Sequence, residues 1–230
     1  IVPHLQPGRR ILVLSWDGTT PGRLAEHLRQ NGMGRSKLTV LEAMGGVRER
    51  VHATTANDFD RADLDPLNTV AIEVVADAGA RVLPLAAGIP DHFFDNDGQI
   101  TKREVRAVTL SKLAPRHGEL LWDVGAGTGS IAIEWMLADP KNRAIAIEPR
   151  ADRLARIARN AATFGVPDLA IVEGLAPAAL VGLATPNAVF LGGGGSDTEL
   201  VKLCMDRLAP GGRLVINAVT LETQAEVIGH

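Results

Sequence analysis

Short apolar runs alternate with amphipathic segments in the first part of the chain, and this pattern predicts several strands and one helix. Strands are expected at residues 11–15, 38–41, 49–55 and 68–76. The helix is expected to begin near Pro21, which suits a first helical turn, and to end at Asn31-Gly32. Residues 11–15 are a short apolar run typical of a buried parallel strand, and the strands around Gly45-Gly46 are expected to pair.

From residue 101 onward, strands and helices alternate strictly. A capping-box pattern at residues 101–104 predicts a helix start, with Val105, Val108, Leu110 and Leu113 on the buried side of that helix. Strands are expected at 120–124, 143–147, 169–172, 188–191 and 214–218, and further helices at 130–137, 151–164 and 198–208. This alternation is typical of βαβ units, so the fold class is α/β, with a parallel sheet covered by helices on both sides.

A stretch rich in proline, glycine and aspartate separates the two parts and covers residues 80–98. Exposed linkers between domains have this kind of composition. We therefore expect a domain boundary near residue 88, which divides the chain into units 1–87 and 88–230.

The candidate chemistry begins where the strand at 120–124 ends in a glycine-rich bend. Glycines let backbone amides approach a ligand and allow positive φ. A dinucleotide loop has the spacing G-x-G-x-x-G, whereas the third glycine here comes one residue earlier and an aspartate precedes the first by two. S-adenosylmethionine has no phosphate but carries an ammonium and a sulfonium, and an acid at this strand end suits such a cationic head, directly or through water. The residues expected to bind it are Asp123, Gly125, Ala126, Gly127, Thr128 and Gly129. The alternative for Asp123 is a carboxylate that stabilises the turn.

Three further strand ends are expected to line the same crevice. Glu148, at the end of the second strand, can accept hydrogen bonds from both ribose hydroxyls of a nucleoside. The third strand leads into Gly174 and Ala176, which we place beside the adenine. The fourth strand ends in the glycines 192–195, of which Gly192 is assigned to the cofactor and Gly193 to the substrate. The alternatives are a solvated charge at Glu148 and a flexible glycine loop.

Charge and composition argue against several classes of function. The net charge is −3 with no long run of one sign, which argues against a nucleic-acid partner. Cys204 is the single cysteine, so it is expected to be a buried apolar group on a helix, and no metal site is assigned. No apolar stretch approaches the roughly 20 residues of a membrane span, and no secretory signal is seen. A soluble, cytoplasmic protein without a membrane partner is therefore expected.

Several segments resemble a known family. Residues 99–107 (QITKREVRA), 120–133 and 214–223 (LVINAVTLET) resemble the carbon-15 methylating and decarboxylating domain of the precorrin-6Y C5,15-methyltransferases of cobalamin biosynthesis. The segments SWDGTTPG and NTVAIEVVA resemble the second half of the carbon-5 methylase domain that precedes it in this fused family. The resemblance implies a class I Rossmann-like methyltransferase domain, truncated at its C-terminal end by two strands, after a partial α/β tetrapyrrole-methylase domain.

The resemblance also implies a substrate and several residue roles. The substrate is a precorrin, a reduced tetrapyrrole with many carboxylates, which is methylated at carbon 15 and loses carbon dioxide from the acetate at carbon 12. Gly125 to Gly129 match the cofactor loop of the family, Glu148 its ribose ligand, Ala176 its position beside the adenine, and Thr101 a threonine that helps close the cofactor pocket. Carbon-5 activity is expected to be absent, and the family suggests a homo-oligomer, specifically a tetramer.

No residue is assigned a catalytic role. Methyl transfer to an electron-rich ring carbon needs alignment more than a general base, and the chain shows no clear nucleophile–base pair. Lys102, Arg103 and Arg106 are candidates for pairing with the substrate carboxylates, and the alternative is an ordinary solvated helix face. Three other interpretations stay open: a methyltransferase of protein or RNA, a nicotinamide-dependent oxidoreductase, and an inactive truncated remnant.

Overall fold

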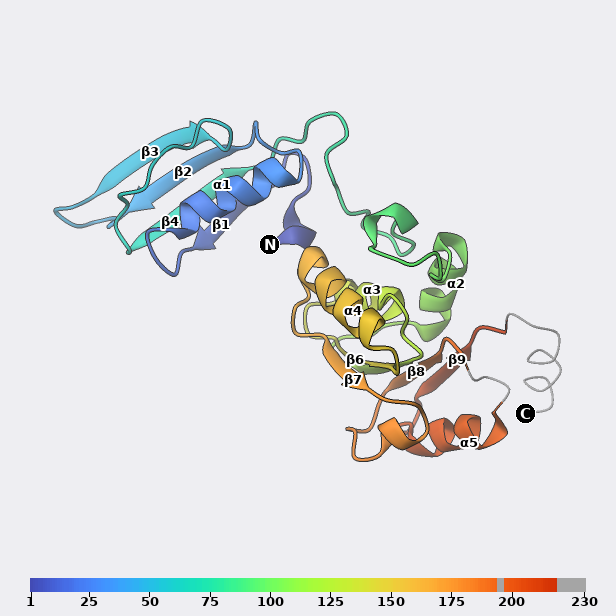
Figure 1. Cartoon of the computed structure of the whole chain (residues 1–230). Helices are drawn as coiled ribbons and strands as arrows, with labels where there is room; N and C mark the ends of the chain where they lie inside the picture. Colours follow the sequence, from blue (N-terminus) through green and yellow to red (C-terminus); the bar gives the residue numbers. More distant parts are fainter. Residues whose placement is uncertain (194–196, 219–230) are drawn as a thin grey trace. The chain divides into compact units, whose positions relative to one another are not determined.

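The computed structural model describes residues 1–193 and 197–218. The chain divides into two compact units, Ile1–Leu83 and Pro84–His230 (Figure 1). The division falls slightly before residue 88, where the sequence predicts it. Gly194, Gly195 and residues 219–223 of the segment that carries the resemblance lie outside the described residues.

The N-terminal unit is a four-stranded antiparallel sheet with one helix on one face (Figure 1). Its elements are the 3-10 helix η1 Val2–His4, β1 Arg10–Leu14, α1 Thr20–Gln30, β2 Lys37–Glu42, β3 Arg50–Thr55 and β4 Asn68–Glu73, with the strand order β1-β4-β2-β3. Leu28 of α1 packs with Leu38, Val40, Val70 and Ile72 of the sheet, all of which are buried. The expected hairpin around Gly45-Gly46 is confirmed, since β2 pairs antiparallel with β3.

Strand β1 corrects one expectation. It is an edge strand that pairs antiparallel with β4, not a buried parallel strand. Ile11 and Val13 pack against the core, whereas Leu12 and Leu14 are 71% and 80% exposed. A continuous apolar run therefore arises here in a strand with only one covered face, and the pattern alone does not distinguish the two cases.

The C-terminal unit is a five-stranded parallel sheet with the order β7-β6-β5-β8-β9. Its strands are β5 Leu120–Val124, β6 Arg143–Glu148, β7 Ala170–Glu173, β8 Ala188–Leu191 and β9 Arg213–Ile216. Its helices are η2 Asp91–Phe93, α2 Arg103–Leu113, α3 Ser130–Ala138, α4 Ala151–Phe164, η3 Ala178–Leu180 and α5 Thr198–Arg207. The expected alternation of strands and helices in this part is confirmed.

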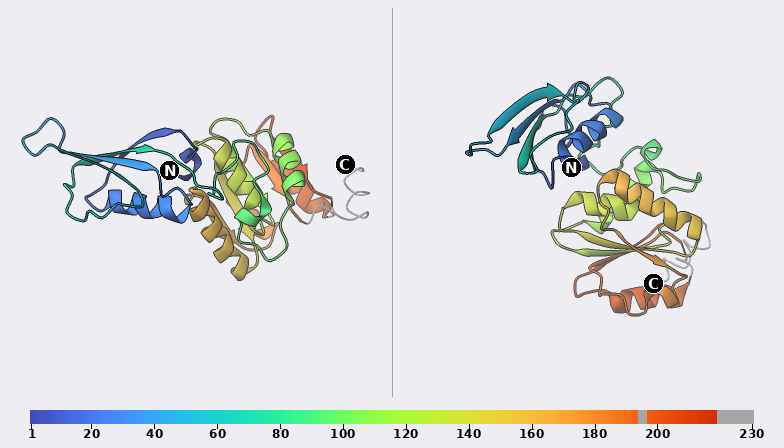
Figure 2. Two further views of the ribbon diagram at one scale, coloured as in Figure 1. Left: turned by 90° about the horizontal axis from the view of Figure 1, so that it is seen from above. Right: turned by 60° about the vertical axis from the view of Figure 1, so that its left-hand side comes forward.

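Helices cover both faces of this sheet (Figure 2). Helix α5 packs its apolar side on Trp122, Val189 and Leu191, while α3 and α4 contact the sheet from the other face. The chain leaves β5 toward β6 on one side and β8 lies on the other side, so the strand order reverses beside β5. Ligands of open parallel sheets bind at such a reversal, next to the carboxyl ends of the strands. No helix in the described part of the chain has the length and apolarity that a membrane crossing requires.

Helix α2 differs from the expected one in its start and its buried side. Lys102 is the N-cap residue and makes no side-chain capping bond, so the predicted capping box at residues 101–104 is wrong. Val105 and Val108 are 48% and 61% exposed, whereas Arg106 is buried together with Leu110 and Leu113. The helix is rotated relative to the expectation because Arg106 has a buried partner, described below.

Candidate functional site

The bend between β5 and α3 is built from three glycines in the left-handed region. The φ angles of Gly125, Gly127 and Gly129 are +75°, +59° and +75°, which residues with a side chain rarely adopt. The amides of Gly125 and Ala126 both donate to the carbonyl of Ile147, at 2.9 and 3.1 Å. A Cβ at Gly129 would lie 3.0 Å from Cγ2 of Ile157, whereas a Cβ at Gly127 would meet only the Gln99 carbonyl oxygen, at 3.9 Å. The bend is therefore packed at its end and open at its middle.

Glu148 holds this bend from the end of strand β6. Its side chain is almost wholly buried, and its Oε2 accepts a hydrogen bond of 2.9 Å from the Gly127 amide. Its Oε1 accepts a bond of 3.2 Å from the Arg150 amide. Each oxygen keeps a second acceptor position, and the residue lines a cavity. The solvated strand-end charge considered as the alternative is not what the structure shows.

Asp123 lies beneath the bend rather than in a cavity. It is 1% exposed, and its Oδ2 accepts a bond of 3.0 Å from the amide of Ala132 in the first turn of α3. Burial raises the pKa of Asp123 to about 7; the Ala132 bond opposes this rise and the charge of Glu148 adds to it. The structure thus favours a carboxylate that stabilises the turn. Asp123 lines neither cavity described below, which argues against the direct contact expected with a cofactor, and a contact through water stays a prediction.

Two cavities flank the glycine bend. One, of about 480 Å³, lies along the strand ends and is lined by Glu148, Leu175, Ala176 and Leu200 among others. The second, of about 370 Å³, lies between the bend and the residues before α2. The predicted cofactor residues that line one or both are Thr101, Gly125, Ala126, Gly127, Thr128, Glu148, Gly174, Ala176 and Gly192. Gly129 lines neither, as its packing against Ile157 requires, and Gly193 lines the larger one.

The strand ends of β5 and β8 approach each other closely at the point where the two cavities meet. A Cβ at Gly192 would lie 2.9 Å from the Gly125 carbonyl oxygen, and a Cβ at Gly125 would lie 3.5 Å from the Gly193 amide nitrogen. The Gly192 amide also donates to the Val124 carbonyl at 2.9 Å. Backbone packing explains the glycine at 192, so the alternative of a merely flexible loop is not needed there.

The three basic residues of α2 have different surroundings. Lys102 and Arg103 are exposed, and Arg103 Nε donates to the Gly88 carbonyl at 2.8 Å. Arg106 is fully buried; its Nε donates to Glu134 Oε1 at 2.6 Å and its Nη2 to Asp91 Oδ1 at 3.0 Å. The guanidinium also donates to the carbonyls of Thr101 and Ile89. Arg106 is therefore occupied inside the protein, and its expected pairing with a substrate carboxylate is wrong.

Arg153 of α4 is a site residue that the sequence analysis missed. It lines both cavities, together with Gly125 and Gly192. Its position five residues after Glu148, in the first turn of the helix that follows β6, is the signal that could have identified it. A residue in that turn lies beside the strand ends where ligands bind.

The described residues show no cluster that could hold a metal ion. No group of three or more His, Cys, Asp or Glu side chains converges within the described ranges. Cys204 is buried on α5, and burial raises the pKa of its thiol to about 11, so it is confirmed as a buried apolar group.

The parallel sheet order, the glycine bend after the central strand and the buried acid on the next strand define a Rossmann-like methyltransferase domain. The chain belongs to the precorrin methyltransferase family, whose domain pattern matches residues 92–230.

Individual relatives agree with this assignment. The chain is 59% identical over 228 residues to the precorrin-6Y C(5,15)-methyltransferase [decarboxylating] of Sinorhizobium sp, covering 99% of this chain and 55% of that protein. It is 40% identical over 132 residues to the cobalt-precorrin-6B C(15)-methyltransferase (decarboxylating) of Salmonella typhimurium, covering 57% of this chain and 68% of the other. A solved structure, the C-terminal domain of precorrin-6Y C5,15-methyltransferase from Rhodobacter capsulatus, is similar with a TM-score of 0.60 and 51% identity, covering 64% of this chain and 79% of that one. The chain spans about half the length of the precorrin-6Y relatives.

Proposed function

We propose that the unit Pro84–His230 binds S-adenosylmethionine and methylates a precorrin-type tetrapyrrole at carbon 15, with loss of carbon dioxide from the acetate at carbon 12. One observation carries the proposal: the buried carboxylate of Glu148 fixes the open middle of the glycine bend while it lines the larger cavity. The precorrin substrate and the decarboxylation are proposed from the names of the relatives.

The residues around the two cavities fit this cofactor. Glu148 offers two carboxylate oxygens to a pair of ribose hydroxyls. Ala176 and the exposed Leu175 offer an apolar wall to an adenine. The open space above Gly127 belongs to the smaller cavity, which Thr101 also lines. This cavity suits the amino-acid end of S-adenosylmethionine. A dinucleotide would instead bring a diphosphate to a bend whose central amide, that of Gly127, already donates to the Glu148 carboxylate.

When bound, S-adenosylmethionine supplies a methyl group activated by its sulfonium. The chain's own residues orient the reactants, and such alignment can contribute roughly 7–11 kcal/mol to lowering a barrier. Gly125 and Gly192 hold the two strand ends together where the cavities meet, which fixes the direction of approach. Ile131 and Phe190 line the smaller cavity with apolar surface that excludes water. An electron-rich ring carbon is the nucleophile, so no side-chain base is assigned, and the conjugated macrocycle serves as the electron sink for decarboxylation.

Lys102 and Arg103 are our proposed partners for the peripheral carboxylates of the substrate, because both side chains are exposed next to Thr101. We further propose that the N-terminal unit corresponds to the second half of a carbon-5 methylase domain and has no carbon-5 activity by itself. A homo-oligomer, specifically a tetramer, and a cytoplasmic location belong to the same proposal.

Two experiments test the proposed function. Calorimetry should show binding of S-adenosylhomocysteine and no competition by NAD; binding of NAD alone contradicts the proposal. Incubation with S-adenosylmethionine and a precorrin-6Y-type substrate, followed by mass spectrometry, should show one added methyl group and one lost carbon dioxide. Methylation of a protein or RNA and not of the tetrapyrrole would instead support the alternative of a protein or RNA methyltransferase. An acidic polymer such as RNA, however, calls for a more basic surface than the net charge of −3 offers.

A further inference from the structure

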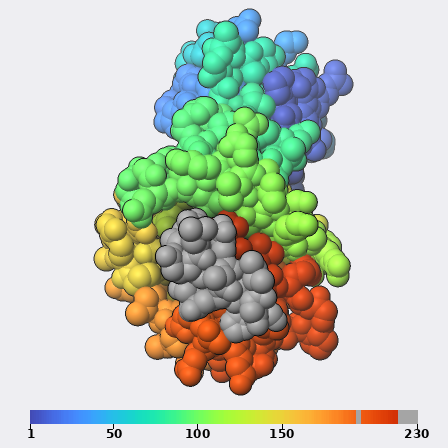
Figure 3. All heavy atoms as spheres, turned by 90° about the vertical axis from the view of Figure 1, so that its right-hand side faces the viewer, coloured from blue at the N-terminus to red at the C-terminus, as the bar shows by residue number. Residues whose placement is uncertain are grey.

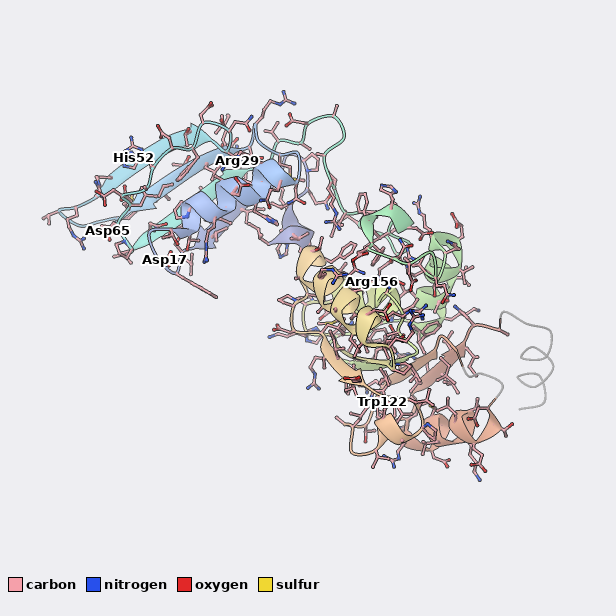
Figure 4. The ribbon with its side chains drawn as sticks, in the orientation of Figure 1. Asp17, Arg29, His52, Asp65, Trp122 and Arg156 are labelled. Atoms are coloured by element: carbon pink, nitrogen blue, oxygen red, sulfur yellow. The ribbon has the colours of Figure 1, made fainter. Side chains whose placement is uncertain are left out.

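Helix α4 presents a row of polar side chains to the segment that precedes α2. Arg153, Arg156 and Asn160 are spaced by three and four residues, so they lie on one side of the helix. The segment before α2 (green) meets the surface of α4 (yellow) in Figure 3. Figure 4 labels Arg156 on this helix. We call residues 97–101 the strap.

Arg153 holds the strap at two points. Its Nε lies 3.0 Å from Asp97 Oδ2, and its Nη2 donates to Gln99 Oε1. Arg156 adds an ion pair, with its Nη1 3.1 Å from Asp97 Oδ2 but without the alignment of a hydrogen bond. The side chains of Arg153 and Asp97 are only 14% and 22% exposed, so solvent screens this pair less than a surface pair. The strap is thus fixed by a partly buried ion pair and a hydrogen bond to the same guanidinium.

The strap lies over the open part of the glycine bend. Gln99, Ile100 and Thr101 line the smaller cavity, and the Gln99 carbonyl oxygen is the nearest atom to a Cβ placed at Gly127. Asn160 links the bend to the chain just before the strap, because its Nδ2 donates to the carbonyls of Asp95 and Thr128 at 2.9 and 3.0 Å. Contacts from α4 therefore determine how closely residues 99–101 approach the bend.

We propose that Arg153 is a positioning residue for the cofactor pocket, which holds the strap against the glycine bend and so retains the amino-acid end of the bound cofactor. This inference rests on the proposed function. Arg153 acts through Asp97 and Gln99, so its loss frees the strap while leaving Glu148 and the glycine bend in place. The consequence is faster ligand dissociation, while the contact of Glu148 with the nucleoside end is kept.

The test compares Arg153→Gln with Arg159→Gln in the 230-residue chain. Arg159 lies on the same helix and pairs with Asp95 at 2.7 Å, but its side chain is 60% exposed and lines neither cavity. Arg153→Gln should raise the Kd for S-adenosylhomocysteine about tenfold, mainly through a faster dissociation rate, because a charge-assisted contact is lost. Arg159→Gln should leave the Kd unchanged. Arg153→Lys should be intermediate, since an ammonium keeps the charge but not the two-point geometry.

Hydrogen exchange of the ligand-free chain gives a second readout that does not depend on binding. The amides of residues 99–101 should exchange faster in Arg153→Gln than in wild type, and Arg159→Gln should match wild type there. Equal effects of the two variants on both Kd and exchange would overturn the inference. Failure of the wild type to bind S-adenosylhomocysteine would overturn the proposed function and the ligand-retention role together, whereas normal binding with an unchanged Arg153→Gln would overturn only the role of Arg153.

Discussion

Glu148 Oε2 accepts a 2.9 Å hydrogen bond from the backbone amide of Gly127, and this bond joins the end of strand β6 to the glycine bend that follows its neighbour β5. The carboxylate thus has two tasks in one place: it fixes the loop conformation and it presents oxygens to the larger cavity. Substitutions at the two residues separate these tasks, because a substitution of Glu148 changes the acceptor and a substitution of Gly127 changes the loop.

Glu148→Gln should weaken ligand binding without unfolding the bend. The amide oxygen of glutamine can still accept from Gly127, but the NH2 group cannot accept from the Arg150 amide, and the charge that strengthens bonds to ribose hydroxyls is lost. We expect the Kd for S-adenosylhomocysteine to rise about tenfold, which corresponds to about 1.4 kcal/mol. Titration calorimetry measures this, with the exposed Glu104→Gln on α2 as the control. Equal affinities of Glu148→Gln and wild type would contradict the assignment of Glu148 to the ribose.

Gly127→Val should abolish binding at a modest cost in stability. The new side chain enters open space, since only the Gln99 carbonyl lies within 4 Å of its Cβ, and this is the space assigned to the ligand. The backbone strain of a left-handed residue costs roughly 1–2 kcal/mol. Gly118→Val is the matched control, because Gly118 has φ of +76° and no atom within 4 Å of a Cβ, and it lines neither cavity. Similar losses of stability with binding lost only in Gly127→Val are expected, and retained binding in that variant would count against the site.

The parallel sheet could be predicted because its signal is local. Each strand of the C-terminal unit is a short apolar run, and each following helix has its own start and stop residues, such as Gly165 after α4. The relation between strand ends then follows from topology, so Glu148 could be placed beside the glycine bend before any geometry was known. Strand β1 shows the limit, since its apolar run is compatible with either a parallel or an antiparallel neighbour.

The orientation of individual charged side chains could not be predicted, because distant partners determine it. Arg106 turns inward because it donates to the buried carboxylate of Glu134, which lies 28 residues later in the chain. Asp123 turns beneath the bend because the Ala132 amide at the start of α3 lacks a helical partner. The contacts of Arg153 could not be predicted for the same reason, although its position near the strand ends could: its partners Asp97 and Gln99 precede it by more than 50 residues.

Asp123→Asn should become more stable relative to wild type as the pH rises. The pKa of Asp123 is raised by burial to about 7 from an ordinary value of 3.8, so between about pH 4 and pH 7 the folded state holds a proton that the unfolded chain has lost. The stability of the wild type therefore falls across this window, and the loss is fully present above about pH 7. Asparagine does not ionise and escapes this loss. Urea unfolding from pH 4.5 to 8 measures the difference, and parallel stability curves would contradict the raised pKa.

Asp97→Asn tests an acid whose pKa is lowered rather than raised, by the same urea unfolding from pH 4.5 to 8. Burial works to raise the pKa of Asp97, but the Gln99 amide and the charges of Arg153 and Arg156 outweigh it and lower the pKa to about 2. An acid with a lowered pKa stabilises the folded state above about pH 4, and this contribution is lost only as the pH falls through about 2. Asp97→Asn should therefore be less stable than wild type by an amount that stays constant from pH 4.5 to 8. A difference that changes within this range would show that Asp97 titrates there.

Arg106→Met should destabilise the C-terminal unit by about 3–5 kcal/mol, the usual cost of leaving one partner of a buried ion pair uncompensated. Lys112→Met is the control, because Lys112 lies on the same helix and is exposed. Replacing both partners, in Arg106→Met with Glu134→Leu, should not restore stability. Glu134 also accepts from the amides of Gly88 and Ile89 at 2.7 and 3.0 Å, and each buried amide left without an acceptor costs about 1–3 kcal/mol.

Fluorescence in urea can follow this unit, because the buried Trp122 and Trp135 belong to it while Trp16 of the other unit is 93% exposed. Because the chain has two units, their unfolding transitions must be separated before a free energy of unfolding is assigned to either. A double variant as stable as wild type would mean that Glu134 serves only to neutralise Arg106. A double variant at least as unstable as Arg106→Met would show that the carboxylate is retained for the backbone amides of residues 88 and 89, which it holds against α3 at the start of the segment that leads to the strap.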